Sequence, residues 1–250
     1  MKGPHGLYVR TSANSARDDN LGFLSIPLRR LAIPFKSPSS LSAHALTDFI
    51  RAIQKRRWEQ GLEAINWKKI RSEDELNKFL SRHKEPVLAA AQKFKIDPST
   101  LGAILIDEYV RHNLEDALTD WLAVLGANTS VGLAQVKIET ARMIVKKAIY
   151  NPDPYNKMLS PKWIQAADGF HLYQYLKQEN FSIHFAAAYI RYLINAWDKK
   201  GRQISSRPGL IASFYSTGWT PNVHPKAVAT ERGRQIERDF LPIARKILHR

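Results

Sequence analysis

The sequence predicts a mainly α-helical fold. From Ser42 onward, apolar residues recur three and four positions apart, which is the spacing of one helix face. Residue types that begin helices stand in front of several of these segments. Alternating apolar and polar runs, which are typical of strands, are nearly absent. The chain has 250 residues and is 44% hydrophobic, so we expect one large domain, or one domain with an appendage, around a real core.

The first third of the chain predicts two different segments. Residues 1–40 carry scattered Ser, Pro, Arg and Gly with little periodicity, and they predict an extended arm. Residues 41–84 predict an N-terminal helical extension, because "SAHALTDFIRAI" has helical apolar spacing. A second helix of this extension opens at Ser72, with Glu75 at the third helical position as in a capping box.

The charge and cysteine content of the chain limit the kinds of partner it can bind and the kinds of metal site it can form. With 38 Lys and Arg against 23 Asp and Glu, the formal net charge of +15 indicates an anionic partner: nucleic acid, an anionic membrane or an anionic cell-wall polymer. The absence of cysteine excludes disulfides and thiolate metal sites. No apolar run approaches the length of a transmembrane segment, and the first 20 residues show no signal-peptide core.

The segment "DPSTLGAILIDEYVRH" predicts a helix that carries a buried carboxylate. Asp97 is suited to the N-cap and Pro98 to the first helical position. Glu108 shares a face with apolar residues three and four positions before it, whereas Asp107 points about 100° away. Burial raises the pKa of a carboxyl group, which suits a general acid. The alternative is that Glu108 pairs with an Arg or Lys, or lies at the solvent rim.

The segment "SVGLAQVKIETA" combines a glycine with an uncharged polar residue ahead of a helical pattern. Thr129 or Ser130 could cap a helix, and Gly132 allows close backbone approach to a ligand or to a neighbouring helix. Gln135 offers donors and an acceptor to a neutral polar ligand. The alternative is a tight contact between helices with an incidental glutamine.

Three further helices complete the order of elements. "FSIHFAAAYIRYLINAW" predicts a helix capped by Ser182, with Tyr189 on its broad apolar face. "LIASFYSTGWTPN" predicts a short helix that ends near Tyr215 and Gly218, where the tyrosine either lines a cleft or packs. "NLEDALTDWLAVLGANT", between Glu108 and Gly132, predicts an amphipathic helix with a glycine stop.

In order and spacing, these segments resemble the lysozyme-like superfamily, specifically soluble lytic transglycosylase and goose-type lysozyme domains. The resemblance covers about residues 85–220 and implies a lysozyme-like domain over 85–250. "AAAQKFKIDPSTLGAILIDEY" is similar to the helix that leads to the catalytic glutamate, which implies that Glu108 is catalytic. Matches to the family's G-L-M-Q, A-A-Y-L and A-Y-N-A-G segments imply a substrate-binding set of Gly132, Leu133, Gln135, Tyr189, Tyr215 and Gly218.

The sequence also departs from that family's pattern. Tyr109 follows the glutamate where the family usually has Ser, and Ala134 stands where it usually has Met. Ser216 and Thr217 replace Asn-Ala. The amphipathic helix predicted after Glu108 replaces an irregular loop.

The resemblance implies cleavage of the β-1,4 bond between N-acetylmuramic acid and N-acetylglucosamine in peptidoglycan glycan strands. Glu108 would act first as acid and then as base in a lytic transglycosylase, with no cofactor and no metal. A hydrolytic muramidase is the alternative, and its second carboxylate could be Glu115, Asp116 or Asp120. Action in the periplasm or the extracellular cell wall follows from the substrate. Phage lysis, injection or loss of a leader could each deliver the protein there.

Two classes without glycosidase activity also fit the sequence. A non-catalytic wall-binding protein is compatible with the departures beside the motifs. A basic nucleic-acid-binding protein is compatible with the charge, and Trp58 and Trp67 lie among basic residues. No recognition motif for a specific nucleic acid is present.

Overall fold

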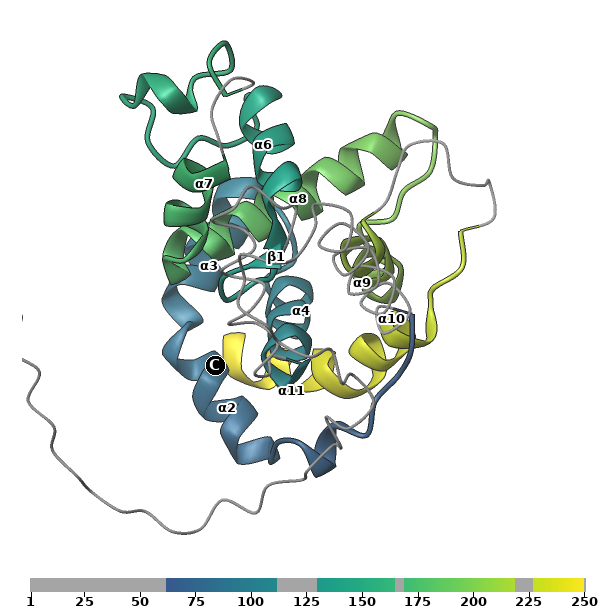
Figure 1. The fold of residues 1–250 in the computed structure, drawn as a ribbon. Coiled ribbons are helices and arrows are strands. Elements are labelled where there is room, and N and C mark those ends of the chain that lie inside the picture. Colours follow the sequence, from purple (N-terminus) through teal and green to yellow (C-terminus); the bar gives the residue numbers. More distant parts are fainter. Residues whose placement is uncertain (1–61, 112–129, 165–168, 219–226, 250) are drawn as a thin grey trace, which may run out of the picture. The chain divides into compact units, whose positions relative to one another are not determined.

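Helices form nearly all of the regular structure in the computed structural model, which describes residues 62–111, 130–164, 169–218 and 227–249 (Figure 1). All of them belong to one unit, Phe49–Arg250. The prediction of a mainly helical, lysozyme-like domain is confirmed. The predicted arm, residues 41–61 of the helical extension and the amphipathic helix after Glu108 lie outside the described residues.

The described elements follow one another in a simple order. They are η3 (Trp67–Lys69), α2 (Glu73–Arg82), α3 (Lys84–Phe94), α4 (Pro98–Arg111), β1 (Ser130–Val131), β2 (Val136–Lys137), α6 (Ile138–Lys146), η4 (Lys157–Leu159), α7 (Gly169–Leu176), α8 (Glu179–Asp198), α9 (Pro208–Thr217), α10 (Glu231–Gln235), the π-helix η5 (Ile236–Phe240) and α11 (Leu241–Leu248). None of these helices is long and apolar enough to cross a bilayer.

Helix α4 is the central element of the fold. It packs against α2, α3, α8, α9, η5 and α11 (Figure 1). Every residue from Ser99 to Glu108 is therefore buried, and not only the face that carries Glu108. Asp107 lies about 100° around the helix from Glu108, but it is fully buried as well, because neighbouring helices pack around α4. A helix enclosed in this way no longer has a solvent face.

Two of the predicted helix starts are confirmed by hydrogen bonds. Ser72 accepts a bond from the Glu75 backbone N–H at 3.3 Å, and the Glu75 carboxylate accepts from the Ser72 backbone N–H at 2.7 Å. The Asp97 carboxylate accepts from the backbone N–H groups of Ser99 and Thr100, at 3.2 and 3.0 Å. These side chains satisfy backbone donors that have no partner within the helix.

Two other predicted starts are wrong. Helix α8 begins at Glu179, after Gln178, so Ser182 lies inside the helix and its hydroxyl is used elsewhere. The stretch around Gly132 does not begin a helix either. Ser130 and Val131 pair with Lys137 and Val136 in an antiparallel hairpin, and α6 starts only after that hairpin.

The C-terminal helices hold the segment that precedes α2. The backbone N–H and carbonyl of Ile65 both bond the Gln235 side-chain amide, at 2.8 and 2.6 Å. The Trp67 indole N–H donates to Asp239 at 3.2 Å. Trp67 is 7% exposed and packs edge-on against Phe240, so it offers no open face for stacking on a base.

Candidate active site

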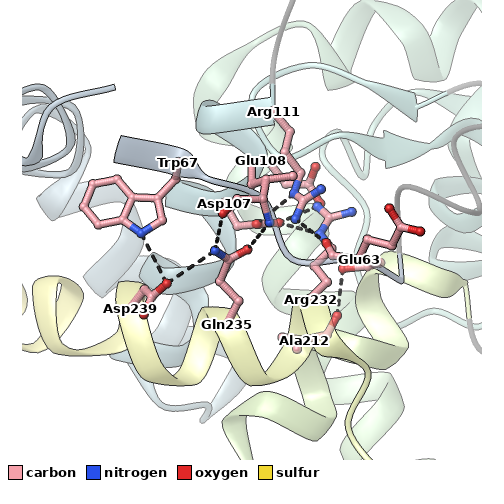
Figure 2. A network of polar contacts seen from close by, with 12 residues as sticks. Glu63, Trp67, Asp107, Glu108, Arg111, Ala212, Arg232, Gln235 and Asp239 are labelled. Carbon is pink, nitrogen blue, oxygen red and sulfur yellow. Dashed lines mark hydrogen bonds and ion pairs between the residues drawn. The ribbon is translucent and has the colours of Figure 1, made fainter. Parts of the chain in front are cut away.

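Glu108 lies in the last turn of α4 and is 8% exposed. Its carboxylate forms a salt bridge with Arg232 of α10, with 2.8 Å between Oε1 and Nη2 (Figure 2). Both features that the sequence offered as alternatives are therefore present, because the carboxylate is buried and is also paired with an arginine. The pairing residue lies 124 positions further along the chain.

Asp107 binds the same arginine. Arg232 Nε lies 2.6 Å and Nη2 lies 2.5 Å from Asp107 Oδ2. The other carboxylate oxygen, Oδ1, accepts a hydrogen bond of 2.9 Å from Arg111 Nε, and Arg111 also donates to the Glu63 carbonyl at 2.8 Å (Figure 2). Two neighbouring carboxylates on α4 thus meet two guanidinium groups in a buried network.

The surroundings of Glu108 favour its protonated form. Burial raises the pKa of the Glu108 carboxyl, and the negative charge of Asp107 raises it further. The positive charges of Arg232 and Arg111 act in the opposite direction, but the pKa remains above its ordinary value. A carboxyl group of this kind can hold a proton and donate it.

Two of the predicted tyrosines lie against each other, and one of them senses the charge of Glu108. The rings of Tyr189 on α8 and Tyr215 on α9 have centroids 5.6 Å apart, and both are at least nine-tenths buried. Burial raises the pKa of the Tyr215 hydroxyl, and the charge of Glu108 contributes to the same shift. The Tyr215 hydroxyl donates to the Ala134 carbonyl at 2.6 Å, so it also holds the β1–β2 loop.

The β1–β2 loop is tied to the helices at Ala134. Its backbone N–H donates to the Ser182 hydroxyl at 3.0 Å, while its carbonyl accepts from Tyr215. Gln135, the next residue, has a left-handed backbone with φ of +48°, and its side chain donates to the Gly132 carbonyl at 3.0 Å. The role of Ser182 in fixing this loop was not apparent from the sequence, where a serine before an apolar run is typical of a cap.

The remaining predicted residues have local structural contacts. Gly132 has φ of +73°, and a Cβ atom there would lie 1.9 Å from the Leu176 carbonyl oxygen. The close approach is therefore to the chain's own backbone, and an approach to a saccharide stays a prediction. Leu133 is partly buried against the core. Gly218 ends α9 in a left-handed conformation, with φ of +68°.

The departure at Tyr109 has a packing explanation. Its ring stacks on Phe79, with centroids 4.1 Å apart and an interplanar angle of 7°, and the Arg71 guanidinium lies 4.8 Å above it. Among the described residues, no group of three or more His, Asp or Glu side chains is arranged to hold a metal ion.

Replacing Tyr215 with Phe is expected to lower the free energy of unfolding by about 1–2 kcal/mol, because the buried Ala134 carbonyl loses its hydroxyl donor. Urea unfolding measures this change. The same substitution at Tyr155, which is 96% exposed, should change it by less than about 0.5 kcal/mol. Equal effects at the two positions would contradict the assigned role of the hydroxyl.

Comparison with known proteins identifies a family. The family described as "T6SS, peptidoglycan muramidase Tse3, catalytic domain" matches residues 51–195. The chain is also 31% identical to the peptidoglycan muramidase Tse3 of Pseudomonas aeruginosa over 113 residues, which cover 43% of this chain and 25% of that protein. No solved structure matches. Since the match spans more than half of its residues, this chain belongs to the Tse3 catalytic-domain family, which is lysozyme-like.

Proposed function

We propose that the chain cleaves peptidoglycan glycan strands at the β-1,4 bond between N-acetylmuramic acid and N-acetylglucosamine, with Glu108 as the general acid. The observation that carries this proposal is a buried glutamate whose pKa is raised, inside the segment that matches a muramidase catalytic domain. The chain spans a quarter of the relative that it matches, so the activity of that longer protein enters here only as support.

The chemistry requires a proton at the leaving oxygen. Glu108 protonates the glycosidic oxygen as the bond breaks and an oxocarbenium-like transition state develops. The resulting carboxylate then removes a proton from the attacking hydroxyl group. Gln135, Tyr189 and Tyr215, with Gly132, Leu133 and Gly218, are proposed to shape the substrate-binding surface around this residue.

The attacking group distinguishes two forms of this activity. Hydrolysis by a muramidase uses water and often a second carboxylate. A lytic transglycosylase uses the 6-hydroxyl of N-acetylmuramic acid and needs one glutamate. Asp107 is unsuited to be the second carboxylate, because it is fully buried and each oxygen already accepts from a guanidinium group. This observation favours the transglycosylase form, while the name of the family favours hydrolysis.

Mass spectrometry of the products from purified peptidoglycan tests the proposal. Muropeptides with anhydro ends would establish the transglycosylase, and reducing ends would establish the muramidase. Binding to sacculi without released products would show a non-catalytic wall-binding protein. A salt-sensitive shift of nucleic acid in a gel, again without products, would support the nucleic-acid-binding alternative.

The site of action follows from the substrate. We propose that the protein acts in the periplasm or the extracellular cell wall, and that the net charge of +15 favours contact with anionic wall polymers. The family description includes a type VI secretion system, which is compatible with injection as the route of delivery.

A further inference from the structure

Arg232 reaches Glu108 from a part of the chain that the family match does not include. The match ends at residue 195, whereas Arg232 lies in the first turn of α10. Its side chain contacts both carboxylates of α4, and Asp107, Glu108 and Arg232 are each at least nine-tenths buried. The C-terminal helices therefore supply a side chain to the candidate active site.

The backbone of Arg232 is held on two sides. Its N–H donates to the Leu62 carbonyl at 3.0 Å. The next residue, Gly233, packs so closely on α9 that a Cβ atom there would lie 2.0 Å from the Ser213 hydroxyl and 2.2 Å from the Gly209 carbonyl. This close contact between Gly233 and α9 fixes where α10 begins, and thus where the guanidinium lies.

The network distributes its charges unequally between the carboxylates. Asp107 Oδ2 accepts from two nitrogens of Arg232, and Oδ1 accepts from Arg111. Glu108 accepts from Arg232 at Oε1, which leaves Oε2 to carry a transferable proton. Asp107 is thus the main counter-ion of the guanidinium, and Glu108 is a secondary partner.

We propose that Arg232 and Asp107 are positioning residues for proton transfer by Glu108. Arg232 fixes the Glu108 carboxyl through Oε1, and Asp107 offsets the arginine's charge so that Glu108 is not held as a permanent ion-pair partner. Catalytic groups must be fixed to within about 0.5 Å, and a misplacement of about 1 Å can cost roughly 10²-fold in rate. This inference rests on the proposed function of Glu108 as the acid.

The charged groups around Glu108 predict that removing Asp107 and removing Arg232 would shift the pKa of Glu108 in opposite directions. Arg232 and Arg111 stabilise its ionised form and Asp107 disfavours it, while the charge of Glu108 acts on Tyr215. Without the Asp107 charge, the arginines would lower the pKa of Glu108. The alkaline limb of the pH profile, where activity falls because the acid loses its proton, would then move to lower pH. Without the Arg232 charge, the same limb would move to higher pH.

The test compares Asp107→Asn, Arg232→Gln and Arg232→Lys by the pH profile of kcat/KM on purified peptidoglycan, with folding checked by circular dichroism. We expect the first two variants to shift the alkaline limb in opposite directions. Arg232→Lys keeps the positive charge but loses the planar guanidinium that contacts both carboxylates. We therefore expect kcat to fall by roughly 10²-fold while the alkaline limb of the pH profile stays in place. Arg238→Gln, an exposed arginine of the neighbouring π-helix, is the matched control and should retain wild-type values.

Shifts in the same direction, or an unmoved limb in folded Asp107→Asn and Arg232→Gln variants, would overturn the inference. Wild-type kcat in Arg232→Lys would do so even if the other two variants do not fold. A carbon-13 NMR titration of the Glu108 carboxyl gives a readout that needs no substrate. If the wild-type protein releases no products but the titration shows the opposite shifts, the charge balance stands and the proposed function fails.

Discussion

Replacing Glu108 with glutamine is expected to lower the rate of glycan cleavage by at least about 10²–10⁴-fold, the usual range for one general acid or base. The loss should reach or exceed that range, because the same residue is proposed to act in both proton transfers. Glutamine keeps the size of the side chain and an oxygen that can accept from Arg232, but it has no transferable proton. Release of soluble muropeptides measures the effect.

The same substitution at Glu139, an exposed residue of α6, is the matched control and should leave the rate unchanged. Glu115→Gln, Asp116→Asn and Asp120→Asn address residues outside the described part of the chain. Each should cost little if Glu108 works alone. A loss as large as that of Glu108→Gln at one of these positions, with reducing-end products, would identify the second carboxylate of a hydrolase. Full activity of Glu108→Gln would show that Glu108 is not the catalytic residue.

The buried carboxyl also makes stability depend on pH. Burial raises the pKa of Glu108 in the folded state above the unfolded value of about 4.5, so the folded protein retains a proton that the unfolded chain releases. This contribution to stability is fully present below the unfolded pKa and is lost as pH rises through the folded pKa. In Glu108→Gln, the decline of unfolding free energy with rising pH should be shallower than in the wild type. An identical slope would show that Glu108 titrates normally.

Replacing Gly132 with alanine is expected to lower the free energy of unfolding by about 2–5 kcal/mol. A left-handed backbone costs an alanine about 1–2 kcal/mol, and relieving a steric overlap in a packed site typically costs a further 1–3 kcal/mol. Both terms apply, because φ is +73° and the new Cβ would lie 1.9 Å from the Leu176 carbonyl oxygen. Urea unfolding of the purified variant measures the loss.

Gly201 provides a control with the same backbone and no contact. Its φ is +71°, and nothing lies within 4 Å of a Cβ added there. Gly201→Ala should therefore lose only the backbone contribution, about 1–2 kcal/mol. If the two alanine variants lose the same amount, the contact between the β1–β2 loop and α7 is not what requires glycine at position 132.

Local patterns predicted the parts of this fold that depend on near neighbours in sequence. The Ser72 capping box, the Asp97 cap and the left-handed end of α9 at Gly218 each follow from a few consecutive residues, and each is present. The burial of Glu108 also followed from helical spacing. Such features require only that a helix forms and that one of its faces is apolar.

The features that local patterns missed depend on residues distant in sequence. The nearby Arg111 pairs with Asp107, but the burial of Asp107 could not be predicted from near neighbours, because its second partner, Arg232, lies about half the chain away. Ser182 has the sequence context of a helix cap, but the loop at Ala134 uses its hydroxyl. The hairpin at Ser130 is two residues long on each side, too short for a pattern of period two to be visible.

The hydrogen bonds of Ile65 with Gln235 and of Trp67 with Asp239 join the C-terminal helices to the segment before α2, and they affect the order in which the molecule folds. Gln235 and Ile65 are 170 residues apart, so their contact closes one of the largest loops available to this chain. Closing such a loop is entropically costly, and contacts of high sequence separation slow folding. Arg232 belongs to the same contact region, because its backbone N–H donates to the Leu62 carbonyl. On dilution from denaturant, helical circular dichroism should therefore recover before enzymatic competence, and a refolding intermediate should be helical yet inert.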